Sequence, residues 1–146
     1  SNGGYPVNKW EKIQNKWYYF DQKGYRQTGW IKTNDIWYFC KEDGTMADAE
    51  WVAVDGKWYY LNLAGEMMTG WVWANGNHRY YCDESGVMQT GWLYNRGKWY
   101  YLKPSGEAAT SWELINGKYY LFDNMGEMYA GRIKADNLDE DSKRTI

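Results

Sequence analysis

The sequence predicts an all-β protein, a solenoid of about six stacked β-hairpins built from repeats of 20–21 residues. Three features predict it: a fixed period in the tryptophans, an aromatic run in each repeat, and a turn dipeptide between two short runs. The first tryptophan of each repeat stands at Trp10, Trp30, Trp51, Trp71, Trp92 and Trp112. A constant period of this length is typical of repeat architectures, in which each repeat is one supersecondary unit.

An aromatic run follows the first tryptophan of each repeat after seven or eight residues, as in Trp58-Tyr59-Tyr60-Leu61. The runs begin at Trp17, Trp37, Trp58, Arg79, Trp99 and Tyr119. A glycine comes seven residues after each of these positions. In four repeats a methionine stands two residues after that glycine, at Met46, Met67, Met88 and Met128. The recurring order predicts that every repeat folds in the same way.

Dipeptides that tolerate positive φ separate the two runs of most repeats. The clearest are Asp55-Gly56, Asn75-Gly76, Arg96-Gly97 and Asn116-Gly117. Such dipeptides favour two-residue hairpin loops. In the third repeat, a two-residue loop places Trp51 opposite Tyr60 and Ala53 opposite Trp58. Alternation along the strands puts these four side chains on one face of the hairpin.

The opposite face of that hairpin carries Val52, Val54, Tyr59 and Leu61, so both faces are apolar. A two-stranded hairpin is only marginally stable alone. We therefore expect each hairpin to bury one face against the preceding repeat and the other against the next. The two tryptophans of one repeat then meet the middle tyrosine of the next repeat. Three electron-rich rings that converge in this way suit a quaternary ammonium ion.

Tryptophan and tyrosine outnumber the usual core residues, since the chain has 11 Trp and 15 Tyr but only 21 Leu, Ile, Val and Phe together. A net charge of only −2 and so many rings argue against disorder. The chain has no basic stretch that would mark a nucleic-acid partner and no apolar run long enough for a transmembrane segment. It also has no metal-ligand spacing, phosphate loop or nucleophile motif, so we expect no catalysis, metal or cofactor.

Three residues whose side chains could take part in catalysis or metal binding are interpreted as structural. His78 is the only histidine and has no nearby partner of the kind that a catalytic or metal site needs. Cys40 and Cys82 occupy the same position in the second and fourth repeats. Because those repeats would not lie above one another, we expect two buried thiols rather than a disulfide.

The repeat resembles the choline-binding repeat of Gram-positive surface proteins and phage lysins. Residues 57–71 carry the resemblance, since they contain Lys-Trp-Tyr-Tyr-Leu followed by Gly-Glu-Met-Met-Thr-Gly-Trp. It implies a left-handed superhelix of hairpins whose junctions hold choline groups of teichoic acids in cages of two tryptophans and one tyrosine, with methionine nearby. The choline-binding residues implied are Trp10, Trp17, Tyr38 and Met46; Trp30, Trp37, Tyr59 and Met67; Trp51, Trp58, Tyr80 and Met88; and Trp92, Trp99, Tyr120 and Met128.

The fourth repeat departs from this pattern, because Arg79 stands where a second tryptophan is expected. A cationic side chain in a cation cage would repel the ligand, which puts the junction of Trp71 with Tyr100 in doubt. Trp73 lies two residues after Trp71 and is the candidate for the missing ring. The last repeat has Tyr119 in place of the second tryptophan, and we interpret that end of the array as a capping unit.

We expect three parts in the chain: a cloning remnant or linker at 1–7, the repeat domain at 8–131, and a degenerate terminal repeat or charged tail at 132–146. The resemblance implies a non-catalytic attachment module, secreted and associated with the cell wall of a Gram-positive bacterium or its phage. Its implied partner is the choline or phosphocholine of teichoic and lipoteichoic acids. A homodimer formed through a terminal repeat is left open.

Two alternatives to choline binding stay open at this stage. Glucan-binding repeats and clostridial toxin repeats have a similar period and similar Tyr-Tyr and Gly-Trp signatures, which would make the chain a polysaccharide-binding domain. The array could equally serve as a structural spacer or a protein-interaction surface. The Lys-Trp-Tyr-Tyr runs at Lys16, Lys57 and Lys98 favour choline, whereas Arg79 and Tyr119 favour the alternatives.

Overall fold

The structure is a computed structural model that describes residues 6–129. These residues form twelve strands paired as six separate two-stranded antiparallel sheets, and they contain no helix. The strands are β1 (Lys9–Ile13), β2 (Lys16–Phe20), β3 (Gly29–Thr33), β4 (Ile36–Cys40), β5 (Glu50–Val54), β6 (Lys57–Leu61), β7 (Gly70–Ala74), β8 (His78–Cys82), β9 (Gly91–Asn95), β10 (Lys98–Leu102), β11 (Trp112–Ile115) and β12 (Lys118–Leu121). The predicted all-β array of six hairpins is confirmed.

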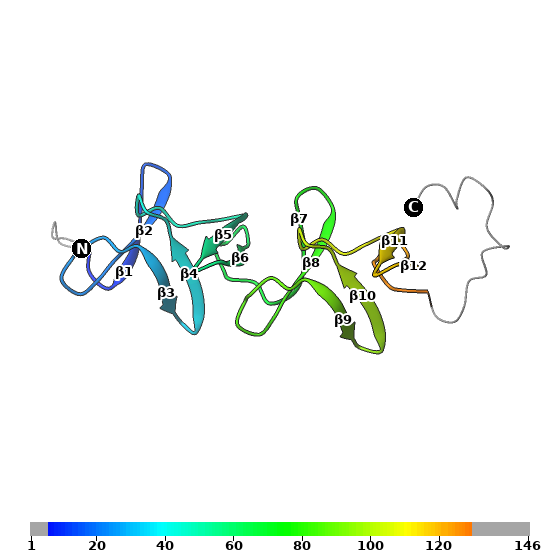
Figure 1. The fold of residues 1–146 in the computed structure, drawn as a ribbon. Helices are drawn as coiled ribbons and strands as arrows, with labels where there is room; N and C mark the ends of the chain where they lie inside the picture. Colours follow the sequence, from blue (N-terminus) through cyan, green and yellow to red (C-terminus); the bar gives the residue numbers. More distant parts are fainter. Residues whose placement is uncertain (1–5, 130–146) are drawn as a thin grey trace. The chain divides into compact units, whose positions relative to one another are not determined.

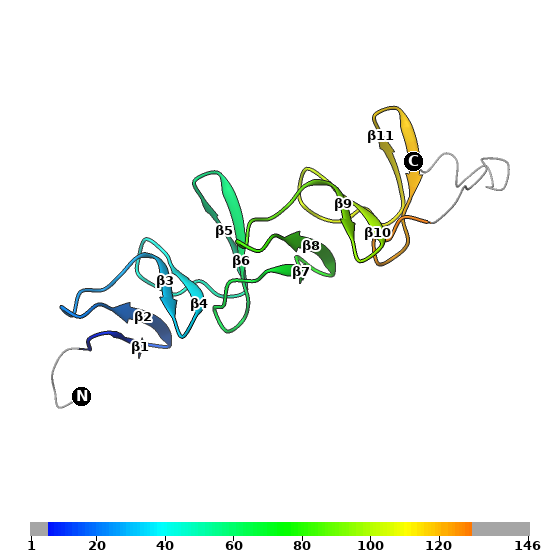
Figure 2. The ribbon, with the colours of Figure 1, turned by 90° about the horizontal axis from the view of Figure 1, so that it is seen from below.

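The described residues group into two compact units. The N-terminal unit comprises 6–69 with 84–87, and the C-terminal unit comprises 70–83 with 88–129. Within the N-terminal unit, the hairpins β1–β2, β3–β4 and β5–β6 follow one another and project in different directions (Figure 1). The hairpins β7–β8, β9–β10 and β11–β12 of the C-terminal unit do the same, as the second view shows (Figure 2). Parts of the predicted segments 1–7 and 8–131, and all of 132–146, lie outside the described residues.

The hairpin register is set by the turn dipeptides. In the third hairpin Trp51 lies opposite Tyr60 and Ala53 opposite Trp58, as predicted. Asp55 and Gly56 both have positive φ, 51° and 78°, the conformation of a type I′ turn. The fourth hairpin has a three-residue loop at 75–77, and Trp73 lies opposite Arg79 there.

In five of the six aromatic runs the last residue is buried in a small core, whereas Phe20, at the end of the first run, is only partly buried. This position holds Cys40, Leu61, Cys82, Leu102 and Phe122, none of which is more than 2% exposed. Each also forms a bridge to a loop residue six positions further on, as Leu61 does to Met67. The bridge folds the connecting loop back under the hairpin, and the methionine, where present, then lies at the junction with the preceding hairpin, as Met46 does beside Trp17.

The two cysteines are buried free thiols, as predicted. Burial raises the pKa of the Cys40 thiol to about 11. Burial also raises the pKa of the Cys82 thiol to about 12, and the neighbouring Asp83 adds to that shift. Both thiols therefore stay protonated near neutral pH and pack as small apolar side chains.

Candidate functional site

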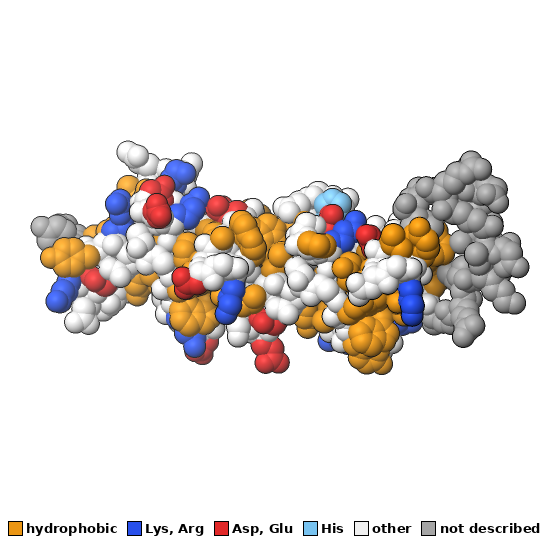
Figure 3. All heavy atoms as spheres, viewed as in Figure 1, with side chains coloured by type: hydrophobic (Ala, Val, Ile, Leu, Met, Phe, Trp, Pro, Cys, Tyr) orange, Lys and Arg blue, Asp and Glu red, His pale blue; other side chains and the backbone are white. Residues whose placement is uncertain are grey.

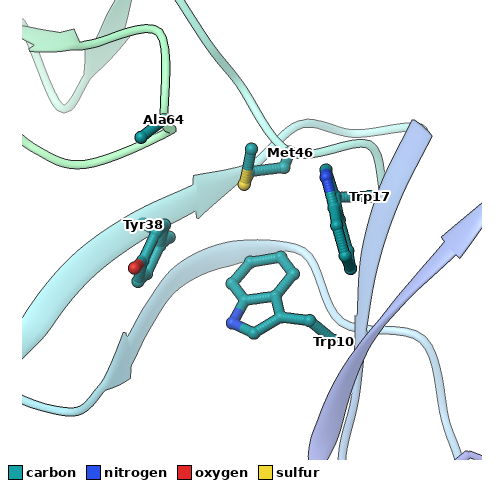
Figure 4. Close-up of a pocket in the computed structure, with 5 residues that line it drawn as sticks. All are labelled: Trp10, Trp17, Tyr38, Met46 and Ala64. Atoms are coloured by element: carbon teal, nitrogen blue, oxygen red, sulfur yellow. The ribbon is translucent and has the colours of Figure 1, made fainter. Parts of the chain in front are cut away.

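The first junction of the array contains an aromatic pocket. Its volume is about 260 Å³, and its lining residues are Trp10, Trp17, Tyr38, Met46 and Ala64 (Figure 4). Trp10 comes from β1, Trp17 from β2 and Tyr38 from β4, whereas the other two residues come from the loops after β4 and β6. Three consecutive hairpins thus contribute to one pocket. This is the convergence of two tryptophans and one tyrosine that the repeat pattern predicts.

The rings of this pocket are held in place by specific contacts. The centroids of Trp10 and Tyr38 lie 5.1 Å apart in an edge-to-face arrangement. The indole Nε1 of Trp10 donates a hydrogen bond to Thr33 Oγ1 at 3.3 Å. The backbone nitrogen of Met46 donates to the carbonyl oxygen of Trp17 at 2.9 Å, which fixes the methionine beside the ring. Trp17 itself is 40% exposed, so the pocket opens to solvent on that side.

The fifth junction, in the C-terminal unit, repeats the same geometry. A pocket of about 370 Å³ is lined by Trp92, Trp99, Tyr120 and Met128. Trp92 lies 6.1 Å from Trp99 and 4.9 Å from Tyr120, with interplanar angles of 87° and 74°. The backbone nitrogen of Met128 donates to the Trp99 carbonyl at 2.8 Å. Two tryptophans, one tyrosine and one methionine therefore line a pocket in each unit.

The second junction brings its predicted residues together in the same manner. Trp30 lies 6.2 Å from Trp37 and 4.9 Å from Tyr59, again with steep interplanar angles. The backbone nitrogen of Met67 donates to the Trp37 carbonyl at 2.9 Å. The third predicted set draws Trp51 and Trp58 from the N-terminal unit, but Tyr80 and Met88 from the C-terminal unit, and it stays a prediction.

The fourth junction differs, and here the structure adds what the sequence pattern missed. Trp71 and Tyr100 lie 4.6 Å apart, which is the expected pairing. The guanidinium of Arg79 lies over this pair, with Cζ 3.8 Å from the Trp71 ring centroid. Arg79 Cζ is 6.0 Å from the ring of Trp73, which is itself half exposed. Trp73 therefore borders the guanidinium rather than completing an open cage.

The first and fifth pockets contain no charged side chain among their lining residues. Their walls are ring faces and methionine, and few polar groups point into them. A sugar in such a pocket would leave most of its hydroxyl groups without hydrogen-bond partners, which is costly on burial. A quaternary ammonium has no hydrogen-bond donor and is attracted by ring faces, so the pockets favour that chemistry over a glycan.

Other residues singled out from the sequence show no sign of a second site. His78 Nδ1 lies 3.0 Å from Glu107 Oε2 in a partly exposed contact. Within residues 6–129, no three His, Cys, Asp or Glu side chains are grouped so that they could hold a metal ion. The same residues include no helix long and apolar enough to cross a membrane. On the face in Figure 3, hydrophobic side chains alternate with charged ones of both signs.

Two models of known protein families match the repeats of this chain. A choline-binding repeat model matches 7–51, 49–87 and 69–111, and a putative cell wall binding repeat model matches 110–128. Comparison with curated protein sequences gave no match.

Several solved structures share the fold. Choline binding protein F from Streptococcus pneumoniae is 40% identical over 82% of this chain and 41% of its own chain, with a TM-score of 0.74. CbpJ from the same species is 34% identical over 87% of this chain and 47% of its own, with a TM-score of 0.76. The pneumococcal cell wall endolysin from phage Cp-1, solved with choline, is 29% identical over 88% of this chain and 39% of its own, with a TM-score of 0.63.

The chain thus spans less than half the length of each of these three structures. The repeat models together cover most of the described residues, and the solved structures share the hairpin array. This chain belongs to the family of choline-binding repeat proteins.

Proposed function

We propose that the chain is a non-catalytic wall-attachment module that binds choline groups of teichoic and lipoteichoic acids between consecutive hairpins. One observation carries the proposal: the first and fifth junctions form separate pockets, each lined by two tryptophans, one tyrosine and one methionine. Relatives support it, because the phage Cp-1 endolysin was solved with choline and choline binding protein F with a peptidoglycan analogue. The proposed choline-binding residues are the predicted sets of the first, second and fifth junctions, and the set of Trp51, Trp58, Tyr80 and Met88 stays a prediction.

The affinity of one such cage follows from cation–π attraction. Each ring face contributes about 0.5–2 kcal/mol toward a cation, with the larger value when water is excluded. Three rings of a half-open pocket then give a dissociation constant of about 1 mM for free choline, which corresponds to roughly −4 kcal/mol. A polymer that carries many choline groups engages several cages at once and binds far more tightly through its higher effective concentration.

The proposal places the protein outside the cell, on the wall of a Gram-positive bacterium or in its phage. Residues 8–131 are the binding domain, and any catalytic activity belongs to other parts of a longer protein. A homodimer through a terminal repeat stays a prediction, which light scattering with and without choline tests. The polysaccharide-binding alternative is not favoured, because the two pockets lack the polar groups that sugars require.

A thermal melt followed by tryptophan fluorescence tests the proposal. Because a ligand that binds only the folded state stabilises it, about 20 mM choline should raise the melting temperature. Equal concentrations of NaCl and of maltose serve as controls and should leave the melting temperature almost unchanged. A rise with maltose but not with choline would contradict the proposal in favour of the glycan alternative, and no rise with either would favour a spacer.

Two substitutions assign the effect to the cages. Trp17→Ala and Trp99→Ala each remove one ring from a different pocket, so each should reduce the number of choline molecules bound in calorimetry by about one. Tyr25→Ala removes an aromatic side chain that is 67% exposed and lines neither pocket, and it should leave the stoichiometry unchanged. Equal binding by all three variants would contradict the residue assignment.

A further inference from the structure

We propose that the fourth junction carries its own ligand: the Arg79 guanidinium occupies the aromatic cage permanently, closes it to choline and locks the three hairpins of the C-terminal unit together. The exclusion of choline rests on the proposed function of the other junctions. The locking of the hairpins stands on the contacts of Arg79 alone.

The guanidinium takes the position of a caged cation. Its Cζ atom lies over the Trp71 ring, 3.8 Å from the ring centroid, and 5.6 Å from the centroid of Tyr100. These two rings correspond to Trp10 and Tyr38 of the first pocket in the repeat pattern. Arginine stacks well on aromatic faces because its guanidinium is planar and weakly hydrated. The Arg79 side chain therefore makes the cation–π contacts with these rings that an external cation would make.

A second contact extends the lock to a third hairpin. Arg79 Nη1 donates a hydrogen bond of 2.7 Å to the carbonyl oxygen of Met125. Met125 lies in the loop after β12 and occupies the repeat position that Ala64 holds at the first pocket. Hydrogen bonds from a charged donor are shorter and stronger than neutral ones. One side chain on β8 thus contacts a ring on β7, a ring on β10 and the loop after β12.

The framework of the cage is retained, and only its occupant has changed. The backbone nitrogen of Ala108 donates to the carbonyl of Arg79 at 2.7 Å, just as that of Met46 donates to Trp17 in the first junction. Ala108 is smaller than the methionine of the other junctions.

The surroundings also disfavour an external cation. The pocket at this junction is lined by Arg79, Arg96 and Lys98, with Glu127 as the one carboxylate among its lining residues. By contrast, the first and fifth pockets have no charged lining residue. A choline group that approached Trp71 would meet a fixed like charge in contact with the same ring. An attached side chain also has an effective concentration that free choline does not reach.

Three variants of the full chain test this proposal. Arg79→Ala empties the cage and removes the bond to Met125. Arg79→Trp restores the paired tryptophans of the other junctions. Arg96→Ala removes a neighbouring charge from the same pocket and is the matched control, because Arg96 is exposed and lies in the β9–β10 turn. Melting temperatures without ligand and choline stoichiometry by calorimetry are measured for all of them and for the wild type.

The proposal predicts that Arg79→Ala melts several degrees below both the wild type and Arg96→Ala when no ligand is present. It also predicts that Arg79→Trp folds and binds one choline more than the wild type. Equal ligand-free melting temperatures of Arg79→Ala and Arg96→Ala would overturn the lock. An unchanged stoichiometry in Arg79→Trp would overturn the exclusion of choline by Arg79.

The failure of this proposal and the failure of the proposed function give different results. If the wild type and Arg79→Trp both bind no choline, the proposed function is wrong. The ligand-free melting temperatures still decide the lock in that case. A lower value for Arg79→Ala than for Arg96→Ala supports it, and equal values overturn it.

Discussion

At the residue scale, Gly65, which follows the third hairpin, is needed for two separate reasons. Gly65 has a φ of +84°, a backbone conformation that residues other than glycine rarely adopt. A Cβ atom at this position would also lie 2.5 Å from Sδ and 2.6 Å from Cε of Met46. The methionine of one repeat therefore packs on the glycine of the next. In the first repeat the stem of Arg26 takes the same place against Gly44.

Gly65→Ala separates these two reasons. We expect it to lower the free energy of unfolding by about 2–4 kcal/mol, from backbone strain plus the displacement of Met46. Gly56→Ala is the control, because Gly56 has a similar φ of +78° but nothing within 4 Å of an added Cβ. It should cost only the strain, about 1–2 kcal/mol. Urea unfolding measures both, and equal losses would mean that Met46 moves aside freely.

At the element scale, the residue opposite the second tryptophan of the cage is a lysine in the first two hairpins and a tyrosine in the fifth. Lys12 lies opposite Trp17, with its Nζ 6.0 Å from the ring centroid. Lys32 takes the same position at Trp37, with Nζ 5.6 Å away. In the fifth hairpin the corresponding residue is Tyr94, whose ring lies 5.0 Å from that of Trp99. The first two junctions thus have a lysine near a ring that is proposed to hold choline.

These neighbours predict a graded affinity among the junctions. Lys12→Tyr gives the first junction the arrangement of the fifth, and it removes a like charge that competes for the Trp17 ring. We expect choline to bind the first junction roughly two- to fivefold more tightly, from about 0.5–1 kcal/mol for one exposed cation–π contact. Calorimetry on a Trp99→Ala background, which removes the fifth cage, measures the change.

The control for this experiment is Lys23→Tyr. Lys23 is exposed in the loop after β2 and lines none of the pockets described above. The Lys23→Tyr substitution makes the same change in net charge and in aromatic content as Lys12→Tyr. An equal gain in both variants would show that net charge, rather than the neighbour of Trp17, sets the affinity.

At the scale of the whole molecule, the N-terminal and C-terminal units each hold open cages, and the proposed ligand is a polymer. Weak sites on one chain then reinforce one another, because the first contact raises the effective concentration at the second. This arrangement needs no tight individual site. It explains why the junctions are built from exposed rings instead of a closed, fully desolvated pocket.

Avidity predicts a particular pattern of loss. On a resin that carries quaternary ammonium groups, Trp17→Ala and Trp99→Ala should each weaken retention moderately, whereas the double variant should be retained far less than either. Free choline should elute the wild type at a concentration at which NaCl does not. If either single substitution abolished retention completely, one site would dominate and the multivalent proposal would be wrong.

Much of the fold could be predicted from the sequence because it depends on local chemistry. The Asp55-Gly56 turn alone places Trp51 opposite Tyr60. Period-two alternation and the repeat length then bring Trp10, Trp17 and Tyr38 to one pocket. The buried thiols could also be predicted, since Cys40 and Leu61 share one repeat position and both are completely buried. Period, turn type and alternation are each properties of a few neighbouring residues.

The tertiary structure alone decided what occupies each junction. The sequence indicated that Arg79 would disturb a cage, but the guanidinium instead fills it and bonds to Met125, 46 residues further along the chain. The packing of Met46 on Gly65 and the place of Lys12 beside Trp17 were likewise absent from the repeat pattern. These contacts depend on side-chain conformations and on loops from other repeats. Repeat spacing specifies which residues face a junction, whereas long-range packing decides whether they leave it open.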